Sequence, residues 1–90
     1  MLMRFNIEQR HLTDASGKPV PSDAHTVAYY STEAATADEA VRLFVVNDGA
    51  EVVGNILKFP GFQAVATVRK PSGVYTLQVS PSSQNLSTIR

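Results

Sequence analysis

The chain contains no cysteine and no tryptophan, and only two of its 90 residues are histidine. The absence of cysteine excludes disulfides, thiolate zinc sites, iron–sulfur clusters and a cysteine nucleophile. The two imidazoles, His11 and His25, flank a long polar loop and have Asp14 and Asp23 as neighbours in the sequence. Two histidines without a further well-spaced ligand are more typical of solvated strand ends than of a metal site. We therefore expect no metal and no cofactor.

An excess of charge of either sign is also missing, because eight Lys and Arg residues balance eight Asp and Glu residues. A dedicated nucleic-acid-binding protein normally carries a basic excess, since phosphate contacts dominate its affinity. No apolar run approaches the ~18 residues that a membrane span requires, and the first residues lack the layout of a signal peptide. We expect a cytoplasmic protein without a membrane partner.

The length and the hydrophobic content of 43% predict one globular domain with a single modest core. Pro81 ends the last apolar segment, and the residues after it are mostly polar. We therefore expect the domain to span residues 1–81 and residues 82–90 to form a C-terminal tail.

Only one segment has the apolar period of a helix. Thr36 and Glu39 have the spacing of a capping box, in which each side chain accepts a backbone N–H at the start of a helix. Gly49 follows as the left-handed residue that ends many helices. The apolar positions between them lie on one stripe, and they are Ala37, Ala40, Val41, Phe44 and Val45. These features predict a helix over residues 37–48.

The remaining apolar segments have the composition or the period-two alternation of strands. They cover residues 3–8, 26–32, 51–59, 62–69 and 74–80. The sequence thus predicts an α+β fold with the order β-β-α-β-β-β, in which one helix packs on a mostly antiparallel five-stranded sheet. We expect the last three strands to form a meander. The two strands joined by the helix are expected to be parallel, with a right-handed crossover.

The turn between the third and fourth strands sets which side chains face the helix. Pro60-Gly61 suits a two-residue type II turn, which places Leu57 opposite Ala64 and Val53 opposite Val68. That register puts Val53, Leu57 and Phe59 on the helix side of the sheet. The predicted core accordingly consists of Ala40, Val41, Phe44, Val53, Leu57 and Val68.

The turn between the fourth and fifth strands, residues 70–73, allows two registers. A three-residue bulged loop turns Tyr75, Leu77 and Val79 away from the helix, whereas a two-residue loop turns them toward it. The chemistry of Pro71 and Gly73 favours the first register. A single apolar face favours the second.

In either register, Val52, Ile56 and Val65 are predicted to share the face away from the helix. One helix about 10 Å wide cannot cover five strands spaced ~4.8 Å apart, so apolar surface is left over. We expect a second copy of the chain to cover these three interface candidates. The competing interpretation is that the loop of residues 13–25 or the tail covers them.

The sequence contains no catalytic constellation. The acidic residues show no paired spacing, and Ser22, Asp23 and His25 are too close in sequence to converge as a triad. The leading hypothesis is a small non-enzymatic module that acts by association, as a homo-oligomer. The alternative is anion or single-stranded nucleic-acid binding through basic and aromatic sheet residues, with Lys58, Arg69 and Tyr30 as ligand-binding candidates. No small-molecule ligand is indicated.

Overall fold

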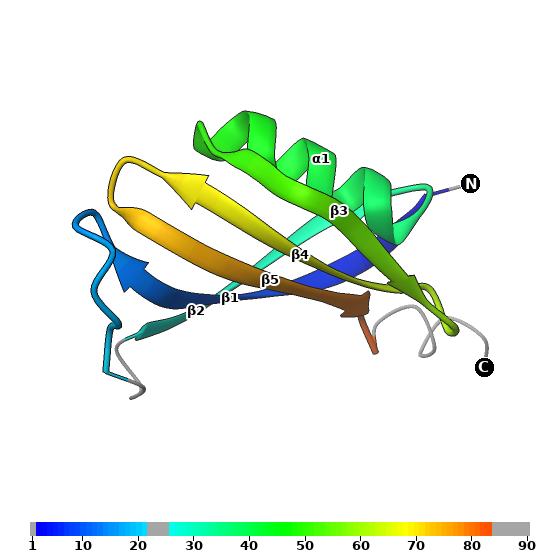
Figure 1. Ribbon diagram of the computed structural model, residues 1–90. Helices are drawn as coiled ribbons and strands as arrows, with labels where there is room; N and C mark the ends of the chain where they lie inside the picture. Colours follow the sequence, from blue (N-terminus) through cyan, green and yellow to red (C-terminus); the bar gives the residue numbers. More distant parts are fainter. Residues whose placement is uncertain (1, 22–25, 84–90) are drawn as a thin grey trace.

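One helix lies in the trough of a curved five-stranded sheet in the computed structural model, which describes residues 2–21 and 26–83 (Figure 1). The elements are β1 (Met3–Asp14), β2 (Val27–Ala34), α1 (Ala37–Asp48), β3 (Glu51–Phe59), β4 (Gln63–Lys70) and β5 (Gly73–Pro81). The sheet order is β2-β1-β5-β4-β3, and every neighbouring pair is antiparallel. The predicted α+β class, element order and meander are confirmed.

The two strands joined by α1 do not pair. β2 and β3 form opposite edges of the sheet, with β1, β5 and β4 between them. Because four antiparallel steps separate them, the two strands still run in the same direction, as expected. The prediction did not include the pairing of β1 with β5, which places the first and last strands at the centre of the sheet.

The predicted helix boundaries are confirmed by the caps at its two ends. At the start, Thr36 Oγ1 accepts a hydrogen bond from the Glu39 backbone N–H at 3.3 Å. The Glu39 carboxylate accepts from the Ala35 N–H at 3.4 Å, one residue before the position that a standard capping box uses. At the end, Gly49 has the left-handed φ of 67°. The helix buries Ala37, Ala40, Val41 and Val45 and half-buries Phe44.

The core lies between α1 and the helix-facing side of the sheet. Lys70 pairs with Gly73, so a two-residue loop joins β4 and β5, and this settles the open register. The register that gives the sheet a single apolar face is therefore the one adopted, although the residues of the turn favoured the bulged loop. The sheet contributes a single layer of buried side chains: Phe5, Ile7, Ala34, Ala64, Ala66, Val68, Tyr75, Leu77 and Val79.

The predicted register of β3 against β4 is wrong. Phe59 pairs with Gln63 across a three-residue loop, because Phe62 adopts a left-handed φ of 59° and adds one residue to the turn. Leu57 therefore lies opposite Val65, and Val53 opposite Thr67. A one-residue change of register moves every side chain of a strand to the other face.

Two predicted core residues, Val53 and Leu57, are consequently outside the core, as is Phe59, which was predicted on the helix side. Val53, Leu57 and Phe59 are 41%, 55% and 47% exposed, respectively. Val52 and Ile56, which were expected to face away from the helix, pack against the core instead. A bulge around Gly54, whose φ is 77°, shifts the pairing by two residues and so leaves this assignment of faces unchanged along β3.

The described chain ends two residues into the predicted tail. Ser82, the first residue of that tail, is buried, and its N–H donates to the Arg4 carbonyl at 2.9 Å. Residues 84–90 of the predicted tail lie outside the described residues, as do residues 22–25 of the long loop. In the described part of the chain, no helix is long and apolar enough to cross a membrane.

Candidate interaction surface

The side of the sheet turned away from α1 is called here the outer face. The strand pairings align one row of its side chains across the whole sheet. The row consists of Tyr29, Glu8, Gln78, Val65 and Leu57, on β2, β1, β5, β4 and β3 respectively. The side chains of this row are polar on the central strands β1 and β5 and apolar on β4 and β3.

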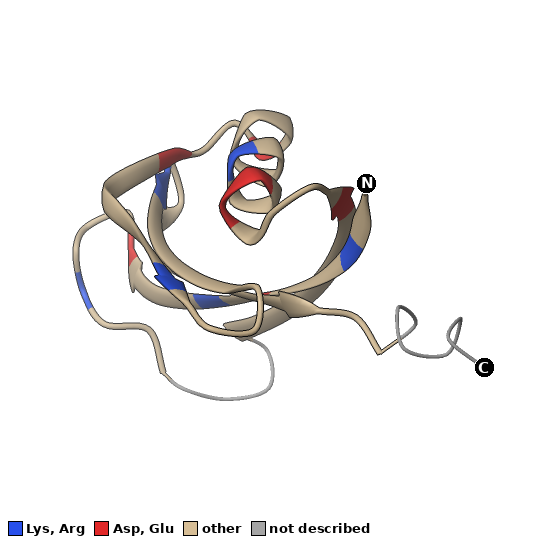
Figure 2. Ribbon diagram, turned by 90° about the vertical axis from the view of Figure 1, so that its right-hand side faces the viewer, with Lys and Arg blue, Asp and Glu red and all other residues tan. Residues whose placement is uncertain are grey.

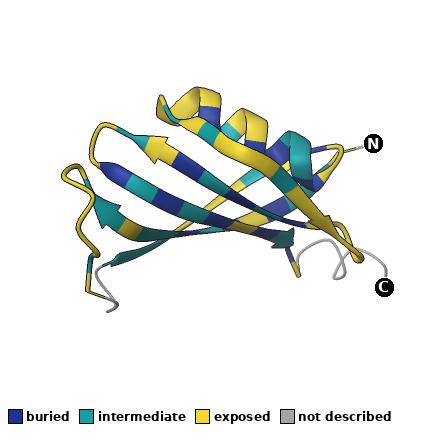
Figure 3. Cartoon of the chain, viewed as in Figure 1, coloured by how far each residue is buried: buried dark blue, intermediate teal, exposed yellow. Residues whose placement is uncertain are grey.

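One group of apolar side chains on the outer face lies along the edge strand β3. It consists of Val53, Leu57 and Phe59 on the edge strand β3, with the half-buried Val65 beside them on β4, and we call these four residues the apolar flank. Figure 3 shows how much of β3 is exposed compared with the buried positions of β4 and β5. Of the three interface candidates from the sequence, only Val65 belongs to this surface.

An open groove of about 820 Å³ crosses the outer face, and Val65 and Phe59 of the apolar flank line one end of it. We call it the outer groove. Tyr29 and Phe59 stand at its two sides, and its uncharged polar lining consists of Asn6, Gln63, Gln78 and Ser80. Glu8 also lines it, and its carboxylate lies 3.5 Å from Arg10. Among the described lining residues there is no Lys or Arg.

The three predicted ligand-binding residues do not come together. Arg69 is on the outer face, where it forms an ion pair with Glu51 across the β3–β4 pairing. Lys58 pairs with the buried Ala64 and is therefore on the helix side. Tyr30 is on the helix side of the opposite edge strand, with its ring 4.9 Å from the Phe44 ring.

The positive charge of Lys58 contributes to the environment of Asp38 at the start of the helix. The pKa of Asp38 is held below its ordinary value, mainly by the hydrogen bond from the Thr36 hydroxyl and, more weakly, by the positive charges of Lys58 and Arg42. A carboxylate in the first turn also interacts favourably with the helix dipole.

Positive charges on the outer face are neutralised locally. In the described chain each arginine of this face lies beside a carboxylate, in the pairs Arg4–Glu33 at 3.7 Å, Arg10–Glu8 at 3.5 Å and Arg69–Glu51. Figure 2 shows basic and acidic positions interspersed around the curved sheet, without a continuous basic patch. Such exposed pairs add little stability, but they leave no concentrated positive potential for a nucleic acid.

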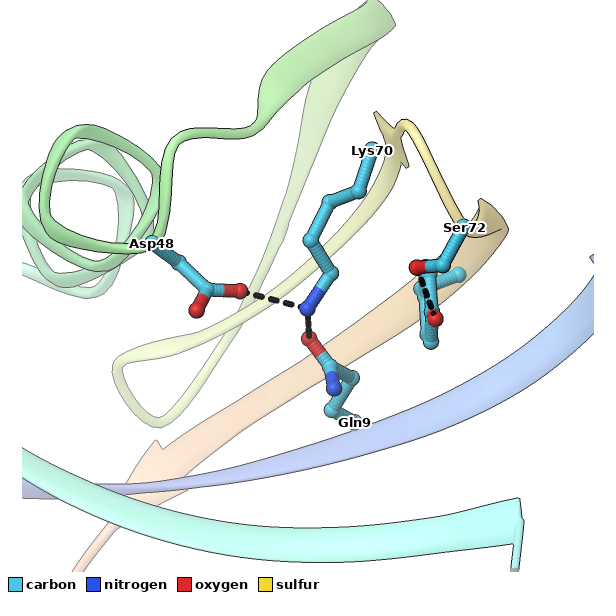
Figure 4. Close-up of polar contacts among 5 residues, drawn as sticks. Gln9, Asp48, Lys70 and Ser72 are labelled. Atoms are coloured by element: carbon cyan, nitrogen blue, oxygen red, sulfur yellow. Dashed lines mark hydrogen bonds and ion pairs between the residues drawn. The ribbon is translucent and has the colours of Figure 1, made fainter. Parts of the chain in front are cut away.

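A polar cluster lies at the C-terminal end of α1 on the helix side of the sheet (Figure 4). Lys70 Nζ donates to Gln9 Oε1 at 3.0 Å and to Asp48 Oδ2 at 2.5 Å, and it lies 4.4 Å from the centre of the Tyr75 ring. The Lys70 side chain is only 15% exposed. These contacts satisfy its ammonium group and attach the end of the helix to three strands. The cluster is therefore a structural clamp.

His11 lies beside this clamp. Its ring stacks on Tyr75 with centroids 4.2 Å apart, and the Tyr75 hydroxyl lies 2.6 Å from Ser72 Oγ. His11 Nε2 is buried and has no hydrogen-bond partner. Within residues 2–21 and 26–83, no three His, Asp or Glu side chains are grouped to hold a metal ion. His25 and Asp23, the other members of the weak metal candidate, lie outside the described residues.

The sequence carried no signal for the clamp, because Gln9, Asp48 and Lys70 are far apart in the chain and meet only when β1 and β4 both pair with β5. The outer groove was missed for the same reason. Comparison of the chain with protein-family models, curated proteins and solved structures finds no match. The function therefore has to be argued from the surface described above.

Proposed function

We propose that this protein is a non-enzymatic association module whose apolar flank packs against a second copy of the chain. The observation that supports the proposal is the exposure of Val53, Leu57 and Phe59 in a row along one edge strand. Their neighbours Val52 and Ile56 already pack against the intrachain core. Burying the exposed row is favourable in proportion to the apolar area removed from water, and α1, on the other side of the sheet, cannot reach it.

A second copy is the occupant that the chain's own properties favour. The formal net charge is zero, so two identical copies do not repel each other electrostatically. A two-fold contact brings the same residues of both copies together, and closed dimers are the commonest form of self-association. The bulge at Gly54 interrupts the free edge of β3, which disfavours simple addition of another strand. The contact should therefore be made by side chains.

The apolar flank is large enough to be the centre of such a contact but not the whole of it. The chain exposes 5915 Å², and a standard interface covers roughly 800 Å² per partner, about one seventh of that surface. Thr67 and Arg69, beside the flank on β4, would form part of the polar rim. The proposal includes a cytoplasmic location, since a chain without cysteine needs no oxidising compartment to fold.

The proposal is tested by the mass of the protein in solution. Light scattering at tens of micromolar, a range suited to ordinary dimer affinities, should give the dimer mass for the wild type and the monomer mass for Leu57→Glu. Val46→Glu is the matched control, because Val46 is 78% exposed on the solvent side of α1, and it should remain a dimer. A monomeric wild type, or a Leu57→Glu variant that is folded by circular dichroism and still dimeric, would contradict the proposal.

The alternative of anion or nucleic-acid binding has no specific observation in its favour. Its three candidate residues are distributed over two faces and both edges of the sheet, and Arg69 is already paired with Glu51.

A further inference from the structure

We propose that the outer groove binds an uncharged, hydroxyl-rich ligand, namely a short carbohydrate chain. This goes beyond self-association. Phe59 and Val65 line one end of the groove and also belong to the apolar flank, so the inference concerns the part of the groove that extends from Gln63 to Tyr29, on the edge opposite the flank. The proposal rests on the side chains that line the groove and on the order in which the strands present them.

Hydrogen-bonding capacity in the groove is high and unused. Asn6, Gln63 and Gln78 form no side-chain hydrogen bond with any of the described residues, although all three line the same groove. An amide side chain donates and accepts hydrogen bonds at the same time. A sugar hydroxyl has the same dual character, so each amide can contact two neighbouring hydroxyls of a carbohydrate.

The strand pairings hold these groups in a regular array. Asn6 lies opposite Ser80, and Gln78 lies between Glu8 and Val65. Neighbouring strands are ~4.8 Å apart, and successive side chains on one face of a strand are roughly 7 Å apart. The polar groups are therefore presented at fixed intervals by paired strands.

An aromatic ring stands at the side of this array that is away from the apolar flank. Tyr29 on β2 is 75% exposed. A sugar ring has an apolar C–H face, which loses contact with water when it packs on an aromatic ring. Three strand spacings separate Tyr29 on β2 from Gln63 on β4, about 14 Å along the sheet. That span suits a chain of several sugar units rather than a single one.

The same lining disfavours other classes of ligand. An anionic ligand needs cationic side chains, whereas the described lining has no Lys or Arg and includes the Glu8 carboxylate. A peptide with apolar anchor residues would have to bury Asn6 and Gln78 without compensating hydrogen bonds, which is costly. A neutral polyol satisfies the amides and also packs on the Tyr29 ring.

The experiment is a titration of the full chain with three neutral tetrasaccharides, maltotetraose, cellotetraose and chitotetraose, followed by amide NMR. We expect at least one of them to shift the side-chain amide signals of Asn6 and Gln78 and the backbone signals around Tyr29. Tyr29→Ala and Gln78→Ala should each weaken binding about tenfold, equivalent to ~1.4 kcal/mol. Asn47→Ala, which removes an exposed amide from α1, should leave the affinity unchanged.

The proposal is overturned if none of the three tetrasaccharides shifts the groove signals, or if Asn47→Ala weakens binding as much as Gln78→Ala does. It is also overturned if a single-stranded oligonucleotide or an apolar peptide binds the groove more tightly than every tetrasaccharide. The two proposals fail separately. Leu57→Glu should change the mass in solution and preserve carbohydrate binding, whereas Tyr29→Ala should preserve the mass and weaken carbohydrate binding about tenfold.

Discussion

Replacement of Gly73 by alanine tests how closely β5 approaches β1 at the start of β5. Gly73 has a φ of +140°, and a Cβ at this position would lie 1.9 Å from the Thr13 carbonyl oxygen and 2.8 Å from His11 Nε2. Contacts this short to backbone cannot be relieved by a change of rotamer. Gly73→Ala must therefore push the start of β5 away from β1, in the part of the sheet where Asp14 pairs with Gly73.

Two terms contribute to the expected loss of stability. The positive φ alone costs an L-residue roughly 1–2 kcal/mol, and forcing extra atoms into a closely packed site typically costs about 1–3 kcal/mol more. Gly73→Ala should therefore lower the free energy of unfolding by about 2–5 kcal/mol. This is a large part of the 5–15 kcal/mol that is typical of a whole domain.

Gly54→Ala is the matched control. Gly54 also has a positive φ, +77°, but a Cβ there meets no atom within 4 Å. It should therefore lose only the conformational term of roughly 1–2 kcal/mol. Urea unfolding followed by circular dichroism measures both variants. Equal unfolding midpoints at equal slopes would show that the close approach of β5 to β1 carries no energetic weight, and the reasoning from the Cβ contacts would be refuted.

Three further predictions concern the core, the clamp and one turn. Leu77→Ala, at a fully buried position, should cost about 3–5 kcal/mol, whereas Phe44→Ala, at a half-buried one, should cost only about 2 kcal/mol; the opposite order in denaturant melts would mean that the core is misassigned. Lys70→Met should lower the free energy of unfolding by about 1–3 kcal/mol, because it leaves the buried Gln9 amide oxygen unpaired. Arg69→Met, which breaks an exposed pair, should change it by less than about 1 kcal/mol. Equal losses of stability in the two variants would argue against the clamp. Hydrogen bonds from the Ser16 hydroxyl and the Lys18 N–H hold the pKa of Asp14 below its ordinary value of 3.8. These bonds therefore stabilise the folded turn fully above pH 3.8, and the stabilisation is lost as the pH falls through the lower pKa that Asp14 has in the folded protein. In a carboxyl NMR titration, Ser16→Ala should raise the midpoint toward 3.8, and an unchanged midpoint would contradict this assignment.

The helix was predictable because its signals are local. Thr36, Glu39 and Gly49 act within one or two turns of their own position, and the apolar stripe between them needs no knowledge of the rest of the chain. The meander of β3, β4 and β5 was predictable for a similar reason, since short turns leave antiparallel neighbours as the simplest arrangement.

The faces of β3 were not predictable from the same signals. Pro60-Gly61 fits a two-residue turn, and the left-handed Phe62 that lengthens the loop has no sequence marker, since a bulky residue rarely adopts a positive φ. One extra residue moved Val53, Leu57 and Phe59 out of the core and brought Val52 and Ile56 into contact with it. Of the predicted interface, only Val65 remains on the outer face.

The sequence by itself determined the class of the fold, the position of the helix and the absence of a net charge, because composition and short-range periodicity decide these properties. Only the tertiary structure decided which residues share a surface. The pairing of β1 with β5 joins residues from both ends of the chain, and it creates the outer groove and the Lys70 clamp together. Such contacts depend on strand order and on register, and both follow from how the whole chain buries its apolar side chains rather than from any single segment.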